Sequence, residues 1–200
     1  MSSKFLLPGQ GTHEEPEWVV WLTVVVALVI GYLLATAVAG QTVVAAAGGT
    51  NVAYPASWSK YNESGAVLAA ADLNNQGIYA PRVIVRQVAK TDLTRKADAT
   101  LNDALKAWTF NQANALVGYH LLNQSSTQVQ GRPAVQVEYA YLLDSPKGAG
   151  GGTMPGLMRA VDTIVASGDQ YYILTFAAES SKFTSLRDLR DELLESWRIP

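Results

Sequence analysis

Residues 160–177 read AVDTIVASGDQYYILTFA and decide the fold class of the chain. Two runs rich in Val, Ile, Tyr and Thr, residues 160–166 and 171–177, flank a polar segment that contains Gly168 and Asp169. β-Branched and aromatic residues favour strands, and a short Gly/Asp segment between two such runs is typical of a hairpin turn. The segment therefore predicts an antiparallel pair of strands.

The sequence before this hairpin alternates between apolar and polar residues. Residues 134–142 read AVQVEYAYL. In a strand, the side chains of Gln136 and Glu138 would lie on one face. The apolar and aromatic side chains would lie on the other face: Val135, Val137, Tyr139 and Tyr141. The turn-forming sequence Gly131-Arg132-Pro133 separates this strand from another predicted strand, residues 120–129. Residues 145–156, SPKGAGGGTMPG, predict a flexible loop because they are rich in Gly.

Two further strands and a helix are predicted earlier in the chain. Residues 66–72 and 81–88 are apolar runs of strand length. A helix follows them, with Thr91 or Asp92 as a cap near its start and with an end near Leu116. Its apolar positions, spaced i, i+4 and i+7, are Leu101, Leu105 and Trp108.

A second helix is predicted at the C-terminal end. Ser185 and Asp188 have the spacing of a capping box, and the residues that follow form one apolar stripe on a charged helix. The stripe consists of Leu186, Leu189, Leu193 and Trp197. Antiparallel strands with segregated helices predict an α+β fold, an antiparallel β-sheet flanked by helices.

A long apolar segment near the N-terminus predicts a single transmembrane helix. Residues 18–39, WVVWLTVVVALVIGYLLATAVA, are 22 residues without a charge, which as a helix is about the thickness of the hydrocarbon core of a bilayer. Trp18 and Trp21 lie at its start, where indole rings favour the membrane interface. Ala37-Val38-Ala39 resembles a signal-peptide cleavage site, but the acidic residues before the segment and its length argue against that alternative.

Small residues recur along this segment at intervals of four. This spacing places them on one face of a helix, where small side chains let a second membrane helix approach closely. The chance recurrence of a common residue is the alternative. The predicted packing face consists of Thr23, Ala27, Gly31, Ala35 and Ala39.

The predicted organisation has four parts. A polar tail, residues 1–17, precedes the transmembrane helix, residues 18–39. A linker rich in Gly and Ala, residues 40–51, leads to a globular domain, residues 52–200. Lys4 on one side of the apolar segment and Lys60 on the other are too few and too distant to fix its orientation in a membrane.

Several short motifs of the domain resemble the PsbP-like superfamily. They are Tyr54-Pro55-Ala56-Ser57-Trp58, Gly131-Arg132-Pro133-Ala134, the strand 171–176, Phe183, and Ser196-Trp197-Arg198. The resemblance covers residues 52–200 and implies an α/β/α sandwich. It also implies a non-catalytic binding or assembly module on the periplasmic, lumenal or extracellular side of a membrane, because several members of the family lie there. The family includes the PsbP subunit of photosystem II, the DcrB and LpqN lipoproteins and a Ran-binding protein.

Composition excludes several kinds of site. The chain has 15 Lys and Arg against 17 Asp and Glu, so it lacks the basic excess that nucleic-acid binding requires. It has no Cys and two His, His13 and His120, which do not have the spacing of metal ligands. No phosphate-binding loop or hydrolase motif is present. We therefore expect no catalytic residue, cofactor or metal.

The expected function is that of a non-catalytic accessory subunit of a larger membrane protein complex, such as one of photosynthetic or respiratory electron transport. Its partners would be other subunits of the complex, contacted by the helix and by the domain, and the lipid bilayer. The alternative is a free-standing, membrane-tethered protein that binds a small molecule or lipid in an apolar pocket of several hundred cubic ångströms between sheet and helix.

Overall fold

The computed structural model describes residues 17–39, 41–73, 79–96, 98–144 and 155–200. The chain divides into two compact units, residues 1–41 and residues 42–200. The predicted polar tail lies outside the described residues except for Glu17, and so does most of the predicted loop at 145–156.

The first unit contains helix α1, Glu17–Ala39, which confirms the helical part of the prediction for residues 18–39. Its side chains are described from Trp18 to Leu34, and almost all of them are exposed. Within the residues that the structure describes, no helix is both long enough and apolar enough to cross a membrane.

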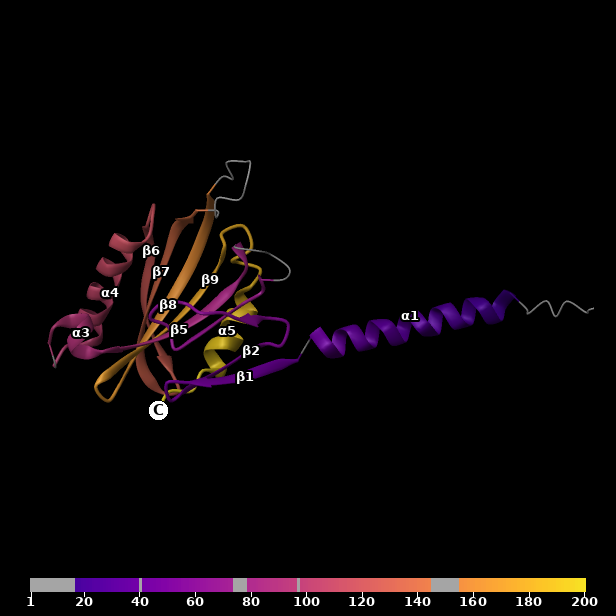
Figure 1. Cartoon of the computed structure of the whole chain (residues 1–200), viewed down its shortest axis with the longest axis horizontal. Coiled ribbons are helices and arrows are strands. Elements are labelled where there is room, and N and C mark those ends of the chain that lie inside the picture. The colour runs from indigo at the N-terminus through magenta and orange to yellow at the C-terminus, as the bar shows by residue number, and fades with distance from the viewer. Residues whose placement is uncertain (1–16, 40, 74–78, 97, 145–154) are drawn as a thin grey trace, which may run out of the picture. The chain divides into compact units, whose positions relative to one another are not determined.

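The second unit is built on a seven-stranded antiparallel sheet (Figure 1). The strand order is β3-β4-β5-β9-β8-β7-β6. The strands are β3 Ser59–Lys60, β4 Leu68–Ala71, β5 Arg82–Ala89, β6 His120–Val129, β7 Arg132–Leu143, β8 Gly156–Ser167 and β9 Gln170–Glu179. The two predicted hairpins are confirmed as β6–β7 and β8–β9, and they lie next to each other through the β7–β8 pairing.

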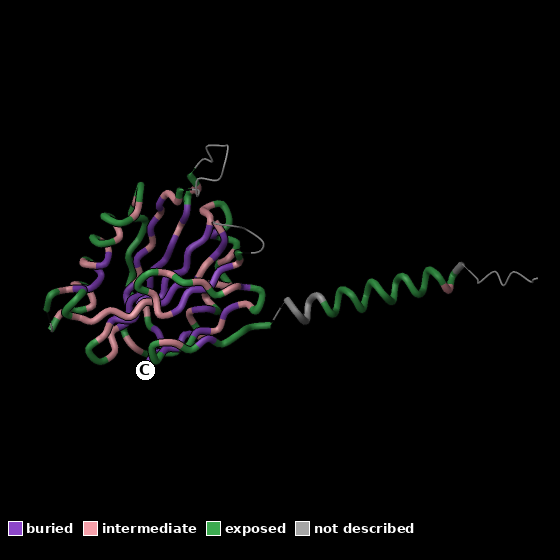
Figure 2. The backbone as a smooth tube through the Cα atoms, viewed as in Figure 1, coloured by how far each residue is buried: buried purple, intermediate pink, exposed green. Residues whose placement is uncertain are grey.

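Helices cover both faces of this sheet, which gives the predicted sandwich. On one face lie α3, Lys90–Thr94, and α4, Leu101–Ala115. On the other face lie α5, Arg187–Ser196, and a separate hairpin of β1, Thr42–Ala47, and β2, Thr50–Pro55. Each face has its own apolar core, and Figure 2 shows the buried residues concentrated in the strands between the two layers.

The predicted linker at 40–51 is wrong, because residues 42–51 belong to the folded domain. They form β1 and the start of β2, joined by a turn in which Gly48 and Gly49 both have positive φ. Such turns match the twist of paired strands and favour Gly. Within the segment Ala45 and Thr50 are buried against the domain, whereas most of the other residues are exposed.

Both predicted helices are present, but their starts differ from the prediction. Thr91 and Asp92 belong to the short helix α3, which ends at Arg95 in the left-handed conformation. Helix α4 begins only at Leu101, where Thr100 and Asp103 form a capping box. Helix α5 begins at Arg187 without a side-chain cap, because the Ser185 hydroxyl donates instead to the carbonyl of Lys182.

The predicted alternation of β7 is confirmed. Val135, Val137, Tyr139 and Tyr141 are buried against α4, whereas Gln136 and Glu138 face the side of α5. The predicted stripe of α5 is also confirmed in its position, with Leu193 and Trp197 fully buried and Leu186 and Leu189 packed at the edge of the same core.

Candidate functional site

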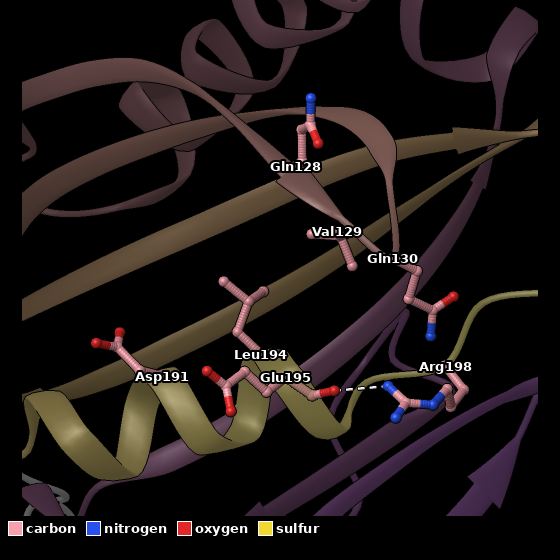
Figure 3. A pocket seen from close by; sticks show the side chains of 7 residues that line it. All are labelled: Gln128, Val129, Gln130, Asp191, Leu194, Glu195 and Arg198. Carbon is pink, nitrogen blue, oxygen red and sulfur yellow. Dashed lines mark hydrogen bonds between the residues drawn. The ribbon is translucent and has the colours of Figure 1, made fainter.

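A hollow of about 560 Å³ lies between helix α5 and the end of strand β6 (Figure 3). Its base is apolar, since Leu194 of α5 and Val129 of β6 face each other across it. Its other lining residues are polar or charged: Gln128, Gln130, Asp191, Glu195 and Arg198. It therefore combines an apolar base with hydrogen-bonding and ionised groups at its rim.

The two carboxylates of the hollow have different surroundings. Asp191 contacts Arg190 at 2.9 Å and Arg187 at 3.6 Å, so two guanidinium groups offset its charge. Among the described residues, the carboxylate of Glu195 forms no ion pair, although the backbone carbonyl of Glu195 accepts a 2.5 Å hydrogen bond from Arg198. Among the described residues, Glu195 is thus the carboxylate of the hollow without an ion pair, and the guanidinium of Arg198, which donates to backbone carbonyls, lies at the same rim.

The hollow owes its shape to the turn between β6 and β7. Gln130 and Gly131 both have positive φ, which makes a tight two-residue connection. The Gln130 amide donates to the carbonyl of Trp197 at 2.6 Å and thereby holds the turn against the segment that follows α5. That segment is also fixed from the other side, since Asn51 of β2 and Arg198 exchange two backbone hydrogen bonds.

Two smaller hollows continue along the same face of the sheet. One, of about 180 Å³, lies between Arg190 and polar side chains of β6 and β7 that include Asn123, Ser125 and Glu138. The other, of about 230 Å³, lies beside Arg159 and Phe183. Arg159 and Glu138 form an ion pair on this surface. Helix α5 therefore leaves the β6–β7 part of the sheet open to solvent.

Strand β6 forms the edge of the sheet next to these hollows. It pairs with β7 on one side, and no described strand pairs with its other side. Eight of its ten residues are exposed, and none of the ten is charged. An edge of this kind presents unpaired backbone donors and acceptors.

The opposite face of the sheet contains a buried carboxylate, Asp162. It is completely buried, and its Oδ2 accepts a 2.5 Å hydrogen bond from the indole N–H of Trp108. Burial raises the pKa of Asp162, while Thr175, Trp108, Tyr139 and Arg86 oppose that shift. Although Tyr139 and Thr175 lie close by, Oδ1 has no hydrogen-bond partner among the described residues. This arrangement joins α4 to the sheet, and none of the hollows described above opens onto it.

The residues that the sequence singled out lie in the other unit of the chain. In α1, Trp18 and Trp21 are 66% and 70% exposed. Thr23 donates to the carbonyl of Val19, and a Cβ added at Gly31 would meet no atom within 4 Å. The backbone of α1 continues through Ala35 and Ala39, but their side chains lie outside the described set.

Sequence reasoning missed the hollow beside α5. Its residues come from a strand end, a turn and one side of a helix, so no local spacing unites them. One signal was present: Asp191, Glu195 and Arg198 follow one another at intervals of four and three, which places them on one side of a helix. Among the described residues, no group of three His, Asp or Glu could hold a metal ion.

No protein-family model matches the chain, and no curated protein matches it. Solved structures do match the fold. The cyanobacterial PsbP protein CyanoP of Synechocystis is 17% identical over 80% of this chain and 92% of its own, with a TM-score of 0.53. LpqN of Mycobacterium tuberculosis, described as involved in cell envelope biogenesis, is 16% identical over 78% of this chain and 89% of its own, with a TM-score of 0.50.

The Ran-binding protein Mog1p of Saccharomyces cerevisiae is 10% identical, covers 80% of this chain and 95% of its own, and also has a TM-score of 0.50. At sequence identities this low, the comparison shows that the folds are similar but says nothing about function. Residues 42–200 therefore form a domain with the PsbP-like fold that CyanoP, LpqN and Mog1p share.

Proposed function

We propose that this protein is a non-catalytic accessory subunit of a larger membrane protein complex, anchored by α1 as a single-pass helix. The domain of residues 42–200 would bind a protein partner at the periplasmic, lumenal or extracellular face of that complex. That this complex belongs to electron transport is a proposal by analogy of fold alone. The observation that carries the proposal is the continuous apolar surface of α1.

The described side chains of α1 form a largely exposed apolar surface. Apart from Val19, the large apolar side chains from Trp18 to Leu34 are between 45% and 70% exposed and lie on all sides of the helix. Exposed apolar surface of this extent is unfavourable in water, at about 25 cal/mol for each Å². A bilayer would cover such a surface on every side at once. The sequence favours this proposal, because the 22 residues from Trp18 to Ala39 carry no charge, although the described part of α1 does not by itself qualify as a membrane-spanning helix.

The surface of the domain supports a protein partner. Three adjoining hollows and an open strand edge lie on one side of the domain, and their side chains are mostly polar or charged. Protein-binding surfaces combine a small apolar centre with a polar rim, and Leu194 and Val129 at the base of the largest hollow provide such a centre.

The alternative function, a free-standing binding protein for a small molecule or lipid, receives partial support from the same hollow. Its volume of about 560 Å³ is suitable for a small ligand. Five of its seven lining residues are polar or charged, however, so its chemistry favours a polar ligand over a lipid chain.

Alkaline extraction of native membranes tests the anchor. If α1 spans the bilayer, the full chain stays in the membrane pellet at high pH, where peripheral proteins are released. Replacement of Ala27 and Gly31 by Arg places two charges in the centre of the segment, each costing about 3 kcal/mol there, and should release the protein. Replacement of the same two residues by Leu is the matched control and should leave it in the pellet. Release of the wild-type chain would contradict the proposal.

A further inference from the structure

We propose that the open edge of β6 binds an extended segment of the partner protein by strand addition, and that a Lys or Arg side chain of this segment enters the hollow beside α5. This inference rests on the part of the proposed function that gives the domain a protein partner. It does not depend on the membrane anchor.

The register of the β6–β7 hairpin shows which backbone groups face the open edge. Val129 and Arg132 flank the two-residue turn and are paired directly, so they form the hydrogen-bonded pair that closes the hairpin. Such pairs alternate along a ladder, so Gln128 belongs to a pair without hydrogen bonds. Its partner in that pair is Pro133, which has no N–H to donate. The backbone N–H and C=O groups of Gln128, Ser126 and Gln124 consequently point away from β7.

These groups form a docking edge for another strand. Exposed edge strands are usually protected from pairing by charged side chains, by Pro or by short length. Strand β6 has ten residues without a charge or a Pro, and its one irregularity lies near Leu122, away from the hollow. Along residues 123–129 the edge can therefore accept a strand without repulsion or obstruction.

The side chains of an added strand would alternate between the two faces of the sheet. Figure 3 shows Val129 directed toward α5 and Gln128 directed away from it. A residue of the added strand opposite Val129 or Thr127 would share the face of Val129, so its side chain would lie above the hollow.

The hollow suits a long basic side chain. The aliphatic stem of Lys or Arg can pack on Val129 and Leu194, while its charged end reaches the carboxylate of Glu195, which lacks an ion pair among the described residues. The hollow also contains the cation of Arg198, which donates to the backbone carbonyls of Glu195 and Trp197, so the two carboxylates of Asp191 and Glu195 outnumber it in the lining. A second copy of this chain fits less well, because β6 contains no Lys or Arg that could pair with Glu195.

Peptide binding to the full chain in detergent micelles tests this inference. The probe is the ten-residue peptide TVTKTVTKTV, blocked at both ends, which matches the length of β6 and places both Lys on one face. The comparison peptide carries Glu at the two Lys positions. We expect the Lys peptide to bind about tenfold more tightly, and we expect Glu195→Gln to reduce this preference to about threefold or less.

Methylation of the peptide nitrogens tests the strand pairing itself. The residues of an added strand that hydrogen-bond to Gln128, Ser126 and Gln124 have their side chains on the α4 face of the sheet. If the Lys side chains of the peptide lie on the opposite face and enter the hollow, the hydrogen-bonded residues are the Thr residues. Methylation of the Thr nitrogens should weaken binding at least tenfold, whereas methylation of the Val and Lys nitrogens should have little effect.

Variants of β6 complete the design. Ser126→Pro removes an N–H that points away from β7, so it should weaken peptide binding at least tenfold while the hairpin stays intact. Ser126→Ala keeps the N–H and should bind like the wild type. If Ser126→Pro fails to fold, the methylated peptides decide the question on the wild-type protein.

Equal binding of both methylated peptides, or no binding of the Lys peptide at millimolar concentration, would overturn the inference. A concentration-dependent dimer that Ser126→Pro abolishes would also overturn it, in favour of pairing with a second copy. These outcomes leave the proposed accessory role open, because that role is measured by co-migration with other subunits in native membranes.

Discussion

The indole N–H of Trp108 donates a 2.5 Å hydrogen bond to Oδ2 of Asp162, and this bond joins helix α4 to the centre of the sheet. Both residues are buried: Asp162 is completely buried, and Trp108 is 7% exposed. Asp162 lies on β8 between Ala160 and Ile164, both of which belong to the apolar core under α4. A buried acceptor of this kind is costly to leave without a partner.

Trp108→Phe should therefore destabilise the domain by more than the smaller buried aromatic ring alone would explain. The variant leaves Asp162 without its indole donor, which should cost about 1–3 kcal/mol in the free energy of unfolding. Urea denaturation of the full chain in detergent measures this. Trp58→Phe is the control, because Trp58 is equally buried and its indole makes no hydrogen bond among the described residues. Equal losses in the two variants would show that the bond contributes nothing.

Asp162 should also make stability depend on pH. Burial raises the pKa of Asp162 in the folded state above the value of 3.8 for an exposed carboxyl. The folded protein then holds a proton that the unfolded chain releases, so the contribution of Asp162 to stability is complete below pH 3.8 and is lost as pH rises through the folded pKa.

Asp162→Asn cannot titrate, and its oxygen can still accept from Trp108. The stability of the wild type relative to this variant should fall as pH rises from about 4, and it should level off above the folded pKa. Unfolding measured by urea between pH 4 and 8 tests the trend, since other titrating groups are common to both proteins. A constant difference across this range would contradict the raised pKa.

Thr50 should contribute more to the stability of the domain than its position at a hairpin turn suggests. Its hydroxyl accepts a 2.8 Å hydrogen bond from the indole of Trp197 and donates a 2.7 Å bond to the carbonyl of Arg198. Thr50→Val removes both bonds at nearly constant volume and should cost about 2 kcal/mol. Thr127→Val, at a half-buried strand position without a side-chain hydrogen bond among the described residues, should change stability by less than about 0.5 kcal/mol. Thermal unfolding of both variants measures the contrast.

The sequence predicted the central strands because their patterns are local. Residues 134–142 alternate with period two, and Gly168 and Asp169 mark the turn between β8 and β9. Helix starts were predicted less well, because Thr91, Asp92 and Ser185 have the composition of caps without their geometry. The β1–β2 hairpin was missed, since small residues such as Ala45 become strand residues only when a core covers them.

The candidate site could be predicted only in fragments. Val129, Leu194 and Arg198 come together through the turn at Gln130, whose hydrogen bond to the carbonyl of Trp197 joins residues 67 positions apart. No pattern in a single sequence encodes that pairing. The open edge of β6 could not be predicted either, because the sequence of the predicted strand at 120–129 does not indicate that the strand lies at the edge of the sheet.

Gly31→Leu tests the predicted helix packing face in α1. A Cβ at this position would meet no atom of the described residues within 4 Å, so the variant should keep its fold and its apolar character. If a partner helix packs on the face of Thr23, Ala27 and Gly31, the larger side chain should lower co-purification with partner subunits at least severalfold. Val29→Leu adds bulk away from this face and should have no effect. Full recovery of partners with Gly31→Leu would refute the packing face.

The most direct test of the accessory role is extraction of native membranes with a mild detergent, followed by a native gel and mass spectrometry of the band that contains this chain. The proposal predicts migration in a band of several subunits in constant ratio, and the co-migrating proteins would then identify the complex. Migration of the chain alone, near its own mass of 21.5 kDa plus detergent, would contradict the proposal.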